Sequence, residues 1–168
     1  IDDKVAFSLG YRVFNKLMRS EGQKTQWEII NINDINAGNF RSDVSQGVMF
    51  RWGTNLASSI GAANISVESP FSASMLAQDT SSWFLFTGFE GRYRFNDMTI
   101  EGNRPGIPEP SAPYDVTLQN WQASAVAGAT WYNQNYGASL TFTIKTPDYE
   151  ESQTDVYGTG SFSVFAFF

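Results

Sequence analysis

Charged side chains recur at every second position within one aromatic stretch of the sequence. Glu90, Arg92 and Arg94 alternate there with small or aromatic residues, so in an extended strand they lie on one face. Guanidinium groups bind phosphate through bidentate contacts, and a row of them could hold an anionic ligand. The same row could instead fill a narrow interior as an ion-pair network, which is the interpretation we favour.

Two further arginines belong to stretches of the same alternating kind. Arg51 lies between Phe50 and Trp52, and Arg12 follows Tyr11. Because alternate residues of a strand point to opposite faces, both arginines are expected on the polar side. The sequence therefore predicts a polar network that lines a lumen and includes Glu90, Arg92, Arg94 and Arg51.

A second candidate is a set of acidic residues that we place in loops. Carboxylate oxygens suit calcium, but the spacing of these residues matches no EF-hand loop. We therefore expect solvated acidic loops, and we assign no metal ligand. The residues are Asp97, Glu101, Asp148, Glu150, Glu151 and Asp155.

The sequence lacks two of the side chains that act most often as a catalytic base or nucleophile in enzymes. The chain contains no histidine and no cysteine, so it holds no imidazole base to activate a serine or a water molecule. No phosphate-binding or dinucleotide-binding signature is present. A net charge of −6 without a basic cluster argues against nucleic acid as a partner. We assign no catalytic residue.

Seven segments of alternating apolar and polar residues must position these side chains. Such alternation predicts strands with one apolar face. No apolar run approaches the roughly 18 residues of a membrane helix, so any membrane-spanning structure must be built from strands. The seven segments are residues 5–13, 27–38, 44–52, 83–95, 121–132, 136–145 and 156–168.

The spacing of two tryptophans favours a membrane barrel. Trp121 and Trp131 are ten residues apart on one face, roughly 33 Å along an extended strand. Tilted in a barrel, this becomes roughly 25 Å, the height of an outer-membrane apolar band bounded by aromatic girdles. Soluble sandwich strands are usually about five or six residues long. We predict an all-β, antiparallel transmembrane β-barrel whose membrane girdle includes Trp121, Trp131 and Phe168.

Connection lengths suggest an orientation and a single barrel domain over residues 1–168. Short turns at 18–24 and 133–135 would face the periplasm, and longer loops at 97–113 and 146–154 the outside. A long connection at about 55–82 would also lie on the periplasmic side, with a helical turn near 72–78. Because bacterial barrels almost always have an even number of strands, and the chain has no initiator methionine or signal peptide, we expect further strands before Ile1.

Several short stretches carry a family resemblance. Residues 83–92 read like an aromatic "W-Y-L-F-x-G-x-E-x-R" strand, and residues 98–103 like an "I-F-L-D-G-N" loop. Residues 146–153 parallel "R-T-K-E-F-x-x-Q", and residues 38–40 and 50–56 parallel "G-N-V" and "R-x-G-x-N-L". The chain closes like a final "F-G-S-x-S" strand. In this order and spacing, the sequence resembles the lipid A 3′-O-deacylase (LpxR-like) family of outer-membrane proteins.

The resemblance implies a fold, a place and a reaction. It implies a twelve-stranded barrel in the Gram-negative outer membrane, of which this chain is the C-terminal half. It also implies a calcium-dependent hydrolase that cleaves the 3′ acyloxyacyl ester of lipid A, the lipid anchor of lipopolysaccharide. The family's histidine base and its Asn-Asp pair lie upstream of the matched region, so neither they nor the calcium ligands are in this chain.

Departures from the family pattern affect individual positions. Asn33 and Asp34 fall where the resemblance places other residues, so we interpret them as a polar strand end. Pro147 stands where the family has lysine, and Arg104 where threonine is usual.

Two function hypotheses remain, and a third conflicts with the sequence. The first is a lipid A deacylase-like esterase whose catalytic groups lie in further strands. The second is a non-catalytic structural or interaction barrel in a complex with other envelope proteins. A soluble lectin-like sandwich conflicts with the strand length and with the apolar terminal strand.

Overall fold

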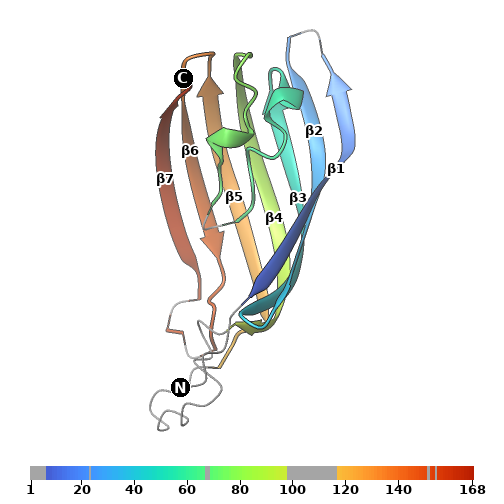
Figure 1. The fold of residues 1–168 in the computed structure, drawn as a ribbon, viewed down its shortest axis with the longest axis vertical. Helices are drawn as coiled ribbons and strands as arrows, with labels where there is room; N and C mark the ends of the chain where they lie inside the picture. Colours follow the sequence, from blue (N-terminus) through green and yellow to red (C-terminus); the bar gives the residue numbers. More distant parts are fainter. Residues whose placement is uncertain (1–6, 23, 67–68, 98–116, 151, 154) are drawn as a thin grey trace.

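Seven antiparallel strands form one sheet in the computed structural model, which describes residues 7–22, 24–66, 69–97, 117–150, 152–153 and 155–168. Each strand pairs with its neighbours in the sequence, in the order β1 to β7 (Figure 1). The strands are β1 (Ser8–Glu21), β2 (Gln26–Gly38), β3 (Arg41–Gly53), β4 (Ser82–Asp97), β5 (Trp121–Tyr132), β6 (Tyr136–Lys145) and β7 (Tyr157–Ala166). The prediction of an all-β antiparallel fold is confirmed.

The two faces of the sheet differ as the alternation predicts. On β5, Trp121 and Trp131 are exposed while Gln122 and Thr130, which point to the opposite face, are buried. On β4, Phe89 is 69% exposed, whereas its neighbour Glu90 is 7% exposed. We call the buried side the inner face and the apolar, exposed side the outer face. An apolar outer face on strands of 10 to 16 residues is typical of an outer-membrane barrel wall.

Aromatic side chains gather near both ends of the outer face. At one end Tyr93 packs edge-on against Trp121, with ring centroids 5.0 Å apart. Toward the other end Trp52 packs against Trp83, and Trp131 packs against Tyr136. Trp83 pairs directly with Trp131, and Tyr93 with Trp121, in one unbroken register. The spacing between the two tryptophans of β5 is therefore also the spacing between two aromatic clusters.

The two ends of the sheet differ in their connections. At what we call the turn end, residues 22–25 and 133–135 form short links. At the loop end, longer connections follow β4 and β6, and a two-residue link joins β2 to β3. The predicted turn at 18–24 begins too early, because β1 continues to Glu21. Residues 98–116, most of the predicted long loop, lie outside the described residues.

The last strand ends before the chain does. β7 stops at Ala166, so Phe168 follows the strand rather than ending it, and its side chain is fully exposed. Phe165 and Phe167 instead pack edge-on with ring centroids 5.6 Å apart, against the buried core. The prediction that the strand runs to the terminal residue is wrong by two residues. The place of Phe168 in a membrane girdle stays a prediction.

The connection between β3 and β4 folds back onto the inner face. It contains two short 3₁₀ turns, η1 (Leu56–Ser59) and η2 (Ala73–Met75), the second within the predicted helical segment. Figure 1 shows it lying across the sheet near the turn end. We call residues 54–66 and 69–81 the inner connection. Its buried side chains join those of the strands in one apolar cluster, which includes Ile30, Ile32, Met49, Leu56, Ala62, Ala63, Ile65, Leu76, Phe84, Phe86, Val126 and Tyr132.

The sheet has two edges, β1 and β7, which do not pair with each other among the described residues. Among those residues, no helix has the length and apolar character needed to cross a membrane.

Charged substitutions on the outer face should cost stability according to depth. We expect Ala127→Arg, midway between the tryptophans of β5, to destabilise the folded barrel by about 2–4 kcal/mol, because arginine is costly at the bilayer midplane. Ala123→Arg, on the same face near Trp121, should cost at most about 1 kcal/mol. Reversible denaturant unfolding in phospholipid vesicles measures both. Equal costs would show that β5 does not span the hydrocarbon as described.

Candidate functional site

A row of polar residues crosses five strands on the inner face. The register places Arg12 beside Asp34, Asp34 beside Ser45, Ser45 beside Arg92, and Arg92 beside Gln122. These residues belong to different strands, so the antiparallel register alone brings them together. The row lies between the apolar cluster and the loop end.

Arg92 is the centre of this row. Its guanidinium donates to Glu90 through Nε (3.2 Å) and Nη2 (3.0 Å), and to Asp43 through Nη1. Asp34 lies 3.4 Å from Nη2 and also accepts a 2.7 Å hydrogen bond from Arg12. One buried guanidinium therefore contacts three buried carboxylates, which is a charge-assisted arrangement of high geometric specificity.

Arg94 extends the network to β5 and to the loop after β6. It donates to the Gln122 side-chain oxygen at 2.7 Å, and it lies 3.4 Å from both Asp97 and Asp148. Asp97 is the last residue of β4 and is buried, so the prediction that it belongs to a solvated loop is wrong. Asp148 is also paired rather than fully solvated, because Lys145 donates to it at 2.6 Å.

The pKa of Asp148 reflects this anchoring. Partial burial tends to raise it, but hydrogen bonds from Lys145 and Gln122 and the charges of Lys145 and Arg94 outweigh burial. The net result is a pKa below the ordinary value of 3.8. Asp148 is therefore ionised at neutral pH and holds the loop after β6 to the wall.

Arg51 lies apart from Arg92 and Arg94. Its Nη1 donates to Glu28 at 2.8 Å, its Nη2 donates to the Ser59 hydroxyl, and its guanidinium carbon sits 4.6 Å from the Phe84 ring centroid. Arg51 is 1% exposed and Glu28 is fully buried. The structure thus divides the predicted network into a cluster near the loop end and a separate pair beneath the inner connection.

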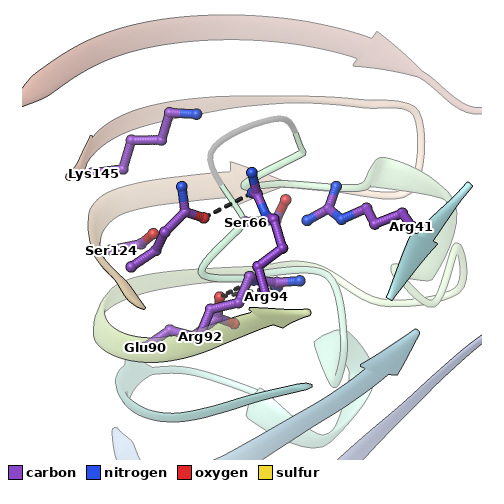
Figure 2. A pocket seen from close by; sticks show the side chains of 8 residues that line it. Arg41, Ser66, Glu90, Arg92, Arg94, Ser124 and Lys145 are labelled. Carbon is purple, nitrogen blue, oxygen red and sulfur yellow. Dashed lines mark hydrogen bonds and ion pairs between the residues drawn. The ribbon is translucent and has the colours of Figure 1, made fainter. Parts of the chain in front are cut away.

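A small cavity lies within the loop-end cluster. It has a volume of about 40 Å³ and is lined by Arg41, Ser66, Glu90, Arg92, Arg94, Gln122, Ser124 and Lys145 (Figure 2). A buried water needs roughly 10–15 Å³ of such space, so this cavity has room for a few waters but not for a lipid head group. Arg41 and Lys145 approach it from opposite sides in the view.

The cluster is balanced in charge. Five cationic side chains, Arg12, Arg41, Arg92, Arg94 and Lys145, form ion pairs with five carboxylates, Asp34, Asp43, Glu90, Asp97 and Asp148. An incoming phosphate would have to displace carboxylates that already satisfy these cations. The arrangement therefore favours an ion-pair network that stiffens the wall over a preformed anion site.

No metal site forms among the described residues. Among them, no group of three or more acidic, histidine or cysteine side chains is placed so that it could hold a metal ion. Asn33 and Asp34 cannot act together, because Asp34 points to the inner face and Asn33 to the outer one. Glu101, Arg104 and Glu151, and the 98–103 stretch of the resemblance, lie outside the described residues.

Comparison with known proteins places this wall in a family. The profile of the family described as "Outer membrane protein LpxR" matches residues 1–168. The chain belongs to the LpxR family. As a member of this family of outer-membrane proteins, it lies in the bacterial outer membrane, as the sequence predicts.

A solved structure agrees with the family assignment. LpxR from Salmonella typhimurium matches with a TM-score of 0.79 over 97% of this chain, at 14% sequence identity. At that identity the likeness shows the fold, which is the β-barrel fold of LpxR. The chain spans 52% of that protein's length. No curated protein sequence matches the chain.

The network should depend more on Arg92 than on Arg12. Arg92→Met leaves Asp34, Asp43 and Glu90 buried without their shared cation, and we expect it to destabilise the barrel by about 3–5 kcal/mol. Arg12 is about one-third exposed, and among the described residues its ion pair is with Asp34, so Arg12→Met should cost at most about 1 kcal/mol. Denaturant unfolding in vesicles measures the difference. A smaller loss for Arg92→Met than for Arg12→Met would contradict a network centred on Arg92.

The contacts by which Asp148 holds the loop after β6 to the wall should weaken only in acid. Since its folded pKa is below 3.8, its contribution is present above that pH and is lost as pH falls through the folded value. Pepsin cleavage within residues 146–156 should therefore accelerate between pH 4.5 and 2, beyond the protease's own pH dependence. Asp148→Asn should be cleaved rapidly throughout this range. Parallel profiles for the two proteins would exclude this anchor.

Proposed function

We propose that the protein acts on lipid A in the outer leaflet of the outer membrane. The reaction would be hydrolysis of the 3′ acyloxyacyl ester, the activity that the family resemblance implies. The observation that supports it is the match of the LpxR family over all 168 residues. Because the chain spans about half of its solved relative, the activity is proposed for the whole protein.

In this proposal, the described residues form part of the barrel wall beside the reaction. The outer face, with aromatic clusters toward both ends, holds the wall at a fixed depth in the bilayer. The charge-balanced cluster around Arg92 keeps the loop-end part of this wall rigid, because Arg92, Arg94 and Asp148 each pair with more than one partner. Such a wall would position loop-end groups at the level of the lipid head groups.

The catalytic base and the calcium ligands would come from outside these residues. The chain contains no histidine, and the carboxylates of the inner cluster are occupied by arginine and lysine. The described residues therefore do not fit the calcium site that the family implies, and no catalytic step is assigned to them.

A second candidate is a non-catalytic barrel with a structural or interaction role among envelope proteins. The charge-balanced ion-pair network around Arg92, which stiffens the wall, fits such a role. The two candidates share the fold and the membrane, and they differ only in chemistry.

Mass spectrometry of lipid A separates these candidates. We expect cells that express the full gene to lose the ester-linked 3′ acyloxyacyl group, while cells with an empty vector retain it. The protein's presence in the outer membrane is checked by its heat-dependent shift on a gel. An unchanged acyl count, with the barrel folded in the membrane, would exclude the deacylase and favour the structural role.

A further inference from the structure

We propose that the inner connection is a fixed plug, which closes the turn-end half of the barrel lumen to solutes. The interior would then be a cup that opens only at the loop end. This role concerns permeability, and it stands independently of any reaction on lipid A.

The first support is burial. Leu56, Ala62 and Ile65 of the inner connection are fully buried, and Leu76 is 6% exposed. They pack against inner-face side chains of β2 to β5 in one apolar cluster. Apolar interiors of this kind are close-packed and leave few voids larger than a water molecule. A loosely tethered loop would not bury its side chains to this degree.

The second support is a notch in the wall that matches one side chain of the plug. Gly47 of β3 and Gly88 of β4 both lie beneath Ile65. A Cβ atom at Gly47 would stand 2.6 Å from Ile65 Cδ1, and one at Gly88 would stand 3.0 Å from Ile65 Cγ1. The wall therefore has no side chains where the plug inserts one, which fixes the height of the plug in the lumen.

Polar contacts fix the same segment at two strands, β3 and β5. The Ser59 hydroxyl accepts from Arg51 of β3, whose charge is balanced by Glu28 of β2. The Ser58 hydroxyl lies 2.8 Å from the Tyr132 hydroxyl at the end of β5. Because Ser59, Arg51 and Glu28 are buried, moving the plug would leave Arg51 without its Ser59 partner in a low-dielectric interior.

The plug also reaches the far side of the sheet. Phe71 lies 5.6 Å, centroid to centroid, from Phe165 of β7. The inner connection thus extends from the Glu28–Arg51 pair on β2 and β3 to β7, across the inner face near the turn end (Figure 1). Short turns are typical of the periplasmic end of such barrels, so the closed half would face the periplasm.

Ion conductance of the intact protein in planar bilayers tests this proposal. We expect no stable conductance from the protein itself. In the test variant, residues 59–76 are replaced by two glycines; the Ala77 backbone N–H bonds to the Ser58 carbonyl at 2.8 Å, so the cut ends already meet. This variant should give stepwise ion conductance. A folded plug-deleted barrel that remains closed, or an intact protein that conducts as an open pore, would overturn the proposal.

Two glycine substitutions test the same idea without a deletion. Gly88→Val adds a side chain beneath Ile65 and should displace the plug, producing conductance and new protease cleavage within residues 54–81. Gly91→Val is the matched control: it lies on the same strand, and its Cβ would have no atom within 4 Å. The control should stay closed and resistant. Identical behaviour of the two folded variants would show that the notch does not hold a plug.

Discussion

The whole structure depends on one constraint, which is that backbone N–H and C=O groups in a bilayer must bond to each other. Hydrocarbon offers these groups no partner, and each unpaired group costs several kcal/mol. The strands are therefore long, and each pairs with its sequence neighbour over most of its length. Once this ladder is set, successive side chains along each strand alternate between the lipid and the interior. The alternation in the sequence is the consequence.

The inner face then has to be stabilised, and the chain does this in two ways. Near the turn end, the strands contribute apolar side chains, and the inner connection supplies the matching apolar surface. Near the loop end, charged residues line the inner face and neutralise one another around Arg92. Glu28 and Arg51 lie in the apolar half, but they pair with each other, and Arg51 also donates to the Ser59 hydroxyl. Buried charge is tolerated in both regions because no member lacks a counter-charge.

The sequence predicts the strands and their two faces, because these depend on the alternation of apolar and polar residues. It does not predict contacts between strands, because these depend on the pairing register. The bounds of β5 and β6 match the predicted segments, since alternation and turn residues mark both ends. Asp34 and Asp43 were not predicted as partners of Arg92, because only the pairing of β2 with β3 and of β3 with β4 brings them together. The inner connection is harder still. Its burial depends on Gly47 of β3 and Gly88 of β4, which leave space for Ile65. The sequence of residues 54–81 alone does not predict that space.

Strand direction limits how such a sheet can close. In an antiparallel sheet of seven strands, β1 and β7 run the same way, as Figure 1 shows. If these two edges paired with each other, they would form a parallel contact, which breaks the pattern of outer-membrane barrels. Closure by antiparallel pairs alone takes an odd number of further strands between them. The five strands that would complete a twelve-stranded barrel satisfy this condition. A second copy of the same sheet also supplies an odd number of strands, but when it is turned about the barrel axis its β1 runs in the same direction as the β7 that it meets, so the contact is again parallel. Edges left open would expose unpaired backbone to lipid, so the constraint that shapes each strand also selects what can complete the wall.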